Sequence, residues 1–263
     1  MKDRSEDVKI DPEMKASNLT KLSRLLFELS QPWRLKVLLL IAEEKQRHSY
    51  ISQKLKISPQ ETSRHLARLQ DAKLIEKDVQ RFYILTTYGE AVLSLLPGFE
   101  FLVEIGEDLM RFNLDVPKEF LERIGELKSF ERMDGVMAIF RSVELALDDV
   151  KEYMWILSPE ILMSTLPIIG KNMEKGLKFR VILPKDVRYP PGFESEQSEY
   201  MRFLDEIKIS IVMTEKSAGF SLPAKDGKID FSIAFGSQDE EFHRWCKDLF
   251  LYYWENAIPM KGF

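Results

Sequence analysis

The sequence predicts an α+β protein in two parts, a small helical domain that ends in a strand pair and a larger α/β domain with a mixed sheet. Short helical periods and one hairpin pattern fill the first third of the chain, and strand-like and helical segments alternate beyond residue 117. Residues 1–96 hold 17 Lys and Arg against 13 Asp and Glu, whereas the rest of the chain holds 21 against 30. A basic first domain is expected if that domain contacts phosphates, although chance variation in charge is an alternative.

The composition restricts both compartment and chemistry. A chain of 263 residues is long enough for at least two domains, and its single cysteine, Cys246, leaves no internal disulfide and no cysteine-cluster zinc site. The N-terminus lacks the apolar core of a signal peptide, and no apolar run approaches the roughly 18 residues of a membrane span. Glycine-rich phosphate-binding motifs and zinc-protease motifs are absent as well. We therefore expect a cytoplasmic protein that does not associate with membranes and needs no metal or cofactor.

Four helices are predicted in the first domain. Leucine spacing indicates helices over 18–29 and 30–44, and a short helix follows from about residue 50. The fourth helix is specified by its start, where Ser58 as N-cap and Glu61 three residues later form a capping box. One side of this helix is apolar and the other is polar and basic, so one side faces a core and the other is available to a partner.

Two antiparallel strands are predicted next, over 74–78 and 81–86. Helix, helix, turn, capped helix and hairpin, in this order, is the layout of a winged helix-turn-helix domain. In such a domain the capped helix fits the major groove, and the hairpin, or wing, lies over the backbone or the minor groove. The candidate DNA contacts are Ser58, Gln60, Thr62, Ser63, Arg64, Arg68, Lys77, Arg81 and Tyr83. A solvated helix face, or a domain that binds protein, remains the alternative.

The amino-acid sequence of this region resembles a known family. ELSQPWRLKVLLLI at 28–41 resembles the helix start of the ArsR-type winged-helix regulators, ETSRHLARLQDAKLIE resembles their recognition helix with its following strand, and YILTTYGEAV resembles the end of their wing. The resemblance covers about residues 19–96 and implies binding to double-stranded DNA, with a structural role for Arg34. The cysteine pairs of the metal-sensing members are absent, so metal sensing does not carry over. The three histidines are scattered and are expected to be surface or core residues: His48, His65 and His243.

The chain after the wing is divided into a linker and a second domain. A capping box from Thr87 to Glu90 and the amphipathic stretch 87–112 predict helix, interrupted at Pro97 and Gly98. This stretch is either the contact surface of a homodimer or a helix packed within its own chain. The predicted domains are the winged helix-turn-helix over 17–96, a helical linker with a dimerisation role over 97–116, and a regulatory α/β domain over 117–263.

Strands and helices are predicted to alternate in the second domain. Helices are expected over 117–128, 134–149, 160–175 and 199–206, and strands over 152–158, 177–184 and 208–213. Asp226 and Gly227 indicate a tight hairpin turn between two further strands. A capping box from Ser237 to Glu240 begins a final helix to about Ala257.

This second half is similar in pattern to the middle domain of archaeal methanogenesis regulators, and that domain in turn looks similar to a phospholipase D sandwich. Lys225, Asp230 and Ser237 fall near the spacing of the phospholipase motif, but Pro223 stands where the nucleophilic histidine is required. Without the imidazole, covalent phosphodiester catalysis is not expected.

The prediction for the whole chain is a dimeric, effector-responsive transcription regulator that binds an imperfect DNA palindrome and is not an enzyme. Ligands of open α/β sheets lie beyond the carboxyl ends of the strands, which adds two residues to the candidate effector site. That site comprises Ser158, Lys185, Lys225, Asp230 and Ser237. The alternatives are a phosphodiester-processing enzyme of phospholipase D-like fold that the winged helix targets to DNA, and a winged-helix adaptor that binds protein.

Overall fold

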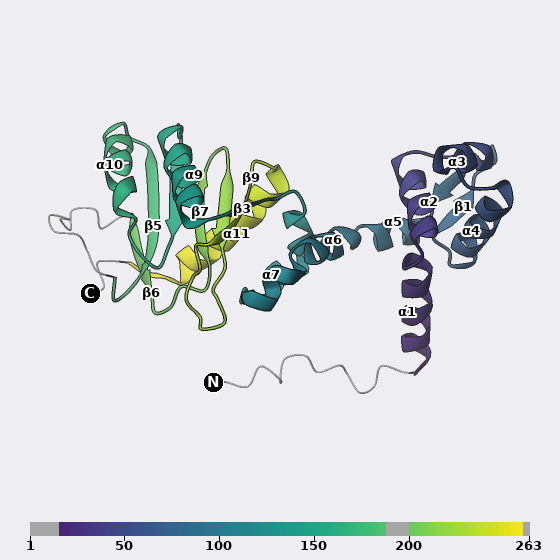
Figure 1. The fold of residues 1–263 in the computed structure, drawn as a ribbon, viewed down its shortest axis with the longest axis horizontal. Helices are drawn as coiled ribbons and strands as arrows, with labels where there is room; N and C mark the ends of the chain where they lie inside the picture. The colour runs from purple at the N-terminus through teal and green to yellow at the C-terminus, as the bar shows by residue number, and fades with distance from the viewer. Residues whose placement is uncertain (1–15, 188–199, 260–263) are drawn as a thin grey trace. The chain divides into compact units, whose positions relative to one another are not determined.

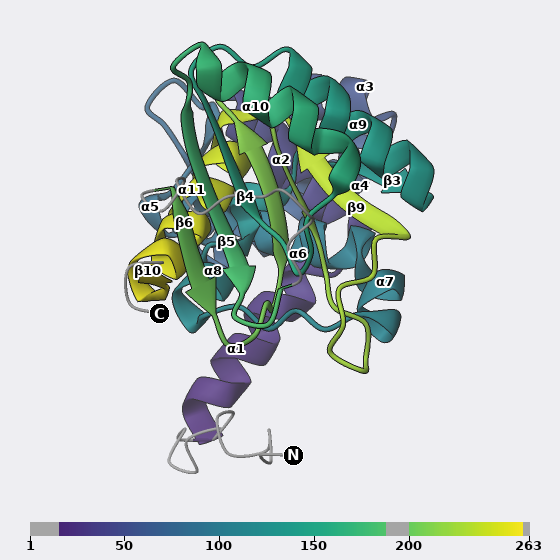
Figure 2. The same cartoon turned by 90° about the vertical axis from the view of Figure 1, so that its left-hand side faces the viewer.

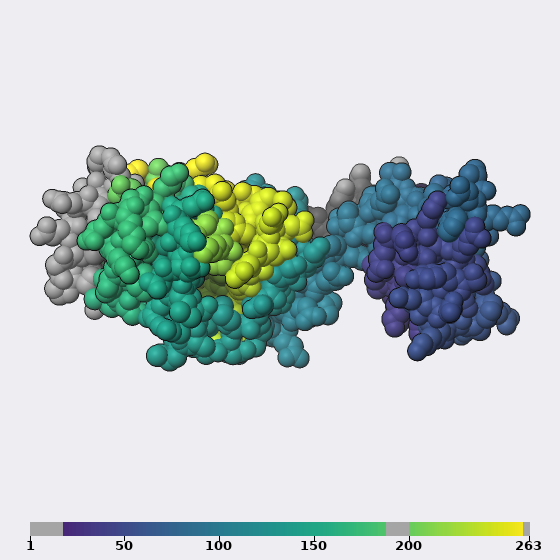
Figure 3. Space-filling model, turned by 90° about the horizontal axis from the view of Figure 1, so that it is seen from above, coloured from purple at the N-terminus to yellow at the C-terminus, as the bar shows by residue number. Residues whose placement is uncertain are grey.

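The computed structural model describes residues 16–187 and 200–259, and the chain divides into two compact units, Met1–Leu95 and Leu96–Phe263. Figure 1 shows the elements of each unit. The predicted fold class is confirmed, because a helical unit with a small wing precedes a unit built on a mixed sheet. In the space-filling view the purple and blue residues of the N-terminal unit pack into one compact body (Figure 3).

The N-terminal unit contains the predicted helices and hairpin. Its elements are α1 (Ala16–Leu29), α2 (Pro32–Glu43), α3 (His48–Leu55), α4 (Pro59–Asp71), β1 (Ile75–Lys77), β2 (Tyr83–Leu85) and α5 (Thr87–Leu93). Val37 and Leu38 of α2, Ile51 of α3 and Leu69 of α4 are fully buried in one core. Strands β1 and β2 are antiparallel, and a single bridge from Gln46 to β2 extends this small sheet.

The C-terminal unit begins with short helices and continues into an eight-stranded sheet. Its helices are α6 (Leu96–Glu104), α7 (Gly106–Arg111), α8 (Lys118–Glu122), α9 (Val136–Asp148), α10 (Leu166–Glu174) and α11 (Glu240–Asn256), with 3-10 turns η2 (Ile124–Leu127) and η3 (Met163–Thr165). Its strands are β3 (Glu131–Asp134), β4 (Tyr153–Leu157), β5 (Lys178–Pro184), β6 (Met201–Leu204), β7 (Ser210–Thr214), β8 (Ala218–Ser221), β9 (Ile233–Ser237) and β10 (Ile258–Pro259).

The sheet has the order β10-β6-β5-β4-β7-β8-β9-β3, and only the β4–β5 and β5–β6 pairs are parallel. Helix α11 covers one face, where Trp245 and Phe250 pack on Phe235 and other strand residues. Helices α9 and α10 cover the other face (Figure 2), where Leu147 and Ile169 belong to a second core. Because side chains alternate across a strand, β4 and β5 supply residues to both cores.

Three local predictions are wrong, and one strand was missed. The helix expected over 199–206 does not form in its described part: β6 lies there, and Met201 and Phe203 alternate in burial with their neighbours, which is the period of a strand. The N-cap of α5 is Thr86, one residue before the predicted Thr87, because its side chain accepts the N–H of Gly89. The N-cap of α11 is Asp239 instead of Ser237, and β3, at the edge of the sheet, was not predicted at all.

The expected linker over 97–116 lies within the C-terminal unit. Phe101 and Ile105 are fully buried in the core beneath α11, and Phe112 and Val116 join the same cluster. The burial of these four residues favours the second of the two predicted roles, in which the inward face of the segment packs within its own chain. The Asp226-Gly227 turn forms as predicted, with φ of +89° at Gly227, a value that glycine adopts without strain.

Candidate nucleic-acid interface

Helix α4 exposes one polar face and buries the other. Gln60, Ser63 and Arg64 are exposed, whereas His65 and Leu66 are buried. The guanidinium of Arg64 makes no hydrogen bond or ion pair with any residue that the structure describes. Such a guanidinium on an exposed helix can form the paired hydrogen bonds that guanine offers in the major groove. Of the residues predicted on α4, these three and Arg68 are exposed.

The N-terminus of α4 is closed by the predicted capping box. Ser58 Oγ accepts the backbone N–H of Glu61 and donates to Glu61 Oε2, and the Glu61 carboxylate accepts the backbone N–H of Ser58 at 3.1 Å. These bonds, first the one from the backbone of Ser58, hold the pKa of Glu61 below its usual range. A carboxylate at this end repels phosphate, so the helix N-terminus is not an anion site and Ser58 is engaged within the cap.

Two of the predicted contact residues face the core. Thr62 is fully buried, and its hydroxyl donates to the carbonyl oxygen of Ser58 at 3.0 Å. Tyr83 is only 6% exposed, and the ammonium of Lys77 lies over its ring at 4.8 Å. The prediction of direct DNA contacts by Thr62 and Tyr83 is corrected accordingly: both side chains stabilise the unit from inside.

Arg68 belongs to an ion-pair network that links three helices. Its guanidinium pairs with the carboxylate of Glu28 on α1, and the same carboxylate lies 3.0 Å from Nε of Arg34 on α2. The side chains of Glu28 and Arg34 are buried, whereas that of Arg68 is half exposed. The structural role expected for Arg34 is what the geometry supports, since its guanidinium also donates to the carbonyl oxygens of Phe27 and Glu28.

The wing exposes the two predicted basic side chains, Lys77 and Arg81. Asp78 shapes the loop, because its carboxylate accepts the backbone N–H groups of Gln80 at 2.9 Å and Phe82 at 2.8 Å. Arg81 has φ of +66°, a left-handed conformation that glycine adopts more readily than residues with a Cβ. The loop therefore keeps an arginine at a position whose backbone favours glycine.

Sequence reasoning missed two further cations beside the wing. Lys45 and Arg47 place their charged groups over the ring of Phe82, at 4.8 and 4.6 Å from its centre. Gln46, which lies between them, forms an isolated antiparallel bridge with Tyr83 of β2, which holds this segment beside the wing. The sequence signal that could have revealed them is the pair of basic residues on either side of Gln46, immediately before α3.

Helix α3 is attached to α4 by a histidine. The Nε2 of His48 lies 3.1 Å from the carbonyl oxygen of Pro59 and 2.9 Å from Oγ of Ser63. Because a carbonyl only accepts, this nitrogen carries the proton. The contact between Nε2 and Oγ orients the Ser63 side chain on the exposed face of α4.

Acidification is expected to destabilise the N-terminal unit through His65. The side chain is buried with Nδ1 unpartnered, and burial, followed by Arg64 and Arg34, lowers its pKa. Below about pH 6.5 the unfolded chain binds a proton that the folded unit excludes, so stability is lost as the pH falls. Urea unfolding between about pH 7.5 and 5.5 is expected to show a larger loss for wild type than for His65→Leu. Equal losses would contradict this role of the imidazole.

The candidate effector residues do not form one site. Lys225 Nζ donates to the carbonyl oxygens of Leu109 and Phe112, Asp230 accepts the N–H of Ser232, and Lys185 pairs with Asp205. Ser158 and Ser237 both line a pocket on the α9 side of the sheet. No hydrogen bond or ion pair joins Lys225, Asp230 and Ser237 within the described part of the chain, so the phospholipase-like spacing does not produce a cluster.

We searched residues 16–187 and 200–259 for metal-binding groups and for membrane-spanning helices and found neither. No group of three His, Cys, Asp or Glu side chains there is arranged to hold a metal ion. No helix among residues 16–187 and 200–259 combines the length and apolar character needed to cross a bilayer.

Known families match both units. Residues 31–77 match the family described as bacterial regulatory protein, arsR family, and residues 138–256 match the middle domain of the methanogenesis regulatory protein FilR1. No curated protein matches the chain. Among solved structures, TrmBL2, an archaeal chromatin protein, is 13% identical with a TM-score of 0.42, covering 91% of this chain and all of its own.

HlyU from Vibrio cholerae is 29% identical with a TM-score of 0.28, over 31% of this chain and 92% of its own. NucT from Helicobacter pylori is 11% identical with a TM-score of 0.37, over 50% of this chain and all of its own. The two family matches carry the assignment: the chain is a transcription regulator whose DNA-binding domain matches the arsR family model and whose C-terminal unit matches the FilR1 middle domain.

Proposed function

We propose that the regulator binds a specific sequence in double-stranded DNA through the exposed face of α4, with the wing on the backbone. The observation that carries the proposal is the unpaired guanidinium of Arg64 beside Gln60 and Ser63. Arginine and glutamine make paired hydrogen bonds to guanine and adenine in the major groove, which distinguish one base pair from another. Arg68 contributes charge to this surface while its ion pair with Glu28 limits its reach.

The wing supplies affinity without sequence information in this proposal. Lys77 and Arg81 are exposed, and Lys45 and Arg47 add two charges beside Phe82. Contacts of such cations with phosphates release counterions, so binding weakens as salt increases.

Binding of wild type and variants to the duplex upstream of the protein's own gene and to a random duplex, at several salt concentrations, tests the proposal. Arg64→Ala is expected to weaken the specific complex about 10-fold to 100-fold and to remove most of the preference. Arg81→Gly, which suits the left-handed backbone, is expected to weaken both complexes alike and to reduce the salt dependence by about one ion. The control Arg141→Ala removes an exposed arginine from the C-terminal unit and is expected to change neither.

Two results would overturn the proposal. If wild type binds no duplex even at low salt, the winged helix serves a protein partner. If Arg64→Ala keeps the full preference, the sequence is recognised elsewhere. Arg68→Ala is a poor probe here, because it also breaks the ion pair with Glu28.

We further propose that the regulator is a homodimer joined through α1. The helix packs on α2, yet Leu19, Leu22, Leu26 and Phe27 are between 44% and 60% exposed. The first three recur at helical spacing along one side, and a stripe of exposed leucines is unfavourable in water unless it is covered. Two copies joined in this way can present two recognition helices to a palindromic site.

Leu22→Glu with Leu26→Glu is expected to convert the dimer into a monomer without unfolding it, since both side chains are exposed. Sedimentation and circular dichroism would show this. Arg24→Glu, on the same helix, changes the net charge by the same two units and is expected to remain dimeric. A dimer that survives the double leucine change would place the interface elsewhere.

A regulatory role without catalysis, in the cytoplasm where DNA is accessible, completes the proposal. Pro223 stands at the nucleophile position of the phospholipase-like pattern, and Lys225 is held by backbone carbonyls. These observations support a binding function for the C-terminal unit over phosphodiester chemistry.

A further inference from the structure

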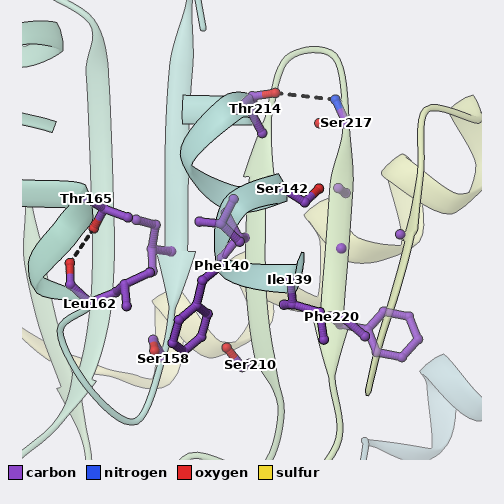
Figure 4. A pocket seen from close by; sticks show the side chains of 18 of the residues that line it. Ile139, Phe140, Ser142, Ser158, Leu162, Thr165, Ser210, Thr214, Ser217 and Phe220 are labelled. Atoms are coloured by element: carbon purple, nitrogen blue, oxygen red, sulfur yellow. Dashed lines mark hydrogen bonds between the residues drawn. The ribbon is translucent and has the colours of Figure 1, made fainter. Parts of the chain in front are cut away.

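The C-terminal unit contains a pocket of about 1060 Å³ between α9, α10 and the sheet face that α11 does not cover. Figure 4 shows Ile139, Phe140 and Ser142 of α9 directed into it, with Ser158 and Ser210 at one end and Thr214 and Ser217 at the other. The volume is at the upper end of the range for sites that take small organic molecules, roughly 300 to 1,000 Å³.

One row of neighbouring residues runs across five strands of the sheet on the pocket side, and its side chains become smaller from β5 to β9. The registers of β5, β4, β7, β8 and β9 place Val181, Ile156, Val212, Gly219 and Gly236 side by side, and all five line the pocket. Val181, Ile156 and Val212 present branched side chains to the pocket, whereas Gly219 and Gly236 present none. The size of the pocket therefore depends on the residues chosen along this row, including the glycines of the neighbouring strands β8 and β9.

The lining is mostly apolar, with hydroxyl groups at a few points. Ser210 and Ser221 are paired across β7 and β8, on the same face of the sheet. Ser210 Oγ donates to the carbonyl oxygen of Leu157 at 3.1 Å. Ser221 is only 4% exposed, and its hydroxyl makes no hydrogen bond with any described residue. Because Ser221 lines the pocket, its hydroxyl is available to hydrogen-bond with a molecule bound there.

The charged groups of the pocket are predominantly acidic. Four carboxylates line it, and the single ammonium, that of Lys216, is already paired with Asp149. The Asp239 carboxylate caps α11 by accepting the N–H groups of Glu241 and Phe242. No positive group is left to pair with an anion, so an anionic ligand would enter against repulsion.

We propose that this pocket binds an uncharged, largely apolar organic molecule whose polar group hydrogen-bonds with Ser221. Apolar contacts with α9, α10 and the sheet supply the affinity, and the hydroxyl orients the ligand. The role of this pocket as the effector site of a regulator rests on the proposed function. The binding of a ligand in the pocket does not depend on that function.

Titration calorimetry on the full-length protein without DNA tests the site with two probes of equal chain length, 1-octanol and octanoate. Saturable binding of 1-octanol is expected, with octanoate at least about 10-fold weaker because of the acidic rim. Val212→Phe fills the space and is expected to abolish binding. Ser221→Ala is expected to weaken it about 5-fold, the size of one neutral hydrogen bond.

Val136→Phe is the matched control, since it makes the same change on α9 at an exposed residue outside the pocket, and it is expected to bind as wild type. Absence of 1-octanol binding, tighter binding of octanoate, or unchanged binding by Val212→Phe would each overturn the proposal. Because no DNA is present, these results are independent of whether the winged helix recognises a sequence.

Discussion

Glu28→Ala is expected to destabilise the N-terminal unit by about 3 to 5 kcal/mol, enough to abolish DNA binding. The Glu28 carboxylate is buried between the guanidinium groups of Arg34 and Arg68. Its removal leaves the buried Arg34 charge without a counterion, and desolvation of that charge is then uncompensated. The ion-pair network of α1, α2 and α4 thereby loses the carboxylate that both arginines share.

Urea unfolding followed by circular dichroism, combined with DNA binding, would measure this effect. Arg68→Ala is the control, because Arg68 is half exposed and its loss is expected to cost no more than about 1 kcal/mol. The Glu28→Ala protein should also lose the transition of the N-terminal unit while keeping that of the C-terminal unit. Similar losses of unfolding free energy for the two variants would contradict the prediction that the buried Glu28–Arg34 pair contributes more than the exposed Arg68 pair.

Features set by a few neighbouring residues were predictable from sequence. The capping box of α4 needs only Ser58 and Glu61, so its geometry followed from four consecutive residues. The same reasoning placed the cap of α11 at Ser237, but β9 extends to that residue and moves the helix start to Asp239. Local signals therefore identified the existence of a helix better than its first residue.

Features that depend on register or on distant pairs were not predictable. Glu28 and Arg68 are 40 residues apart, and nothing in either segment indicates that they meet. Burial of Thr62 on an otherwise polar helix face also depends on how α4 packs. The alignment of Gly219 with Gly236 in the pocket wall is known only once the strands are paired, because neither glycine alone indicates it in the sequence.

Trp245→Ala is expected to destabilise the C-terminal unit by about 3 to 5 kcal/mol. Trp245 is fully buried on α11, its Nε1 donates to the carbonyl oxygen of Phe120 at 3.0 Å, and its ring meets that of Phe120 edge to face. Truncation removes the apolar contacts, opens a cavity and leaves a buried carbonyl without its donor.

The expected result is a lower urea midpoint for the C-terminal transition, followed by near-ultraviolet circular dichroism. Trp33→Ala, which removes a 37% exposed tryptophan from α2, is the control and is expected to lose less than about 1 kcal/mol. Trp245→Phe should fall between them, because it keeps most of the ring contacts and loses the hydrogen bond. If Trp245→Phe costs as much as Trp245→Ala, the bond to Phe120 outweighs packing in holding α8 to α11, since the phenyl ring keeps most of the packing and loses the bond.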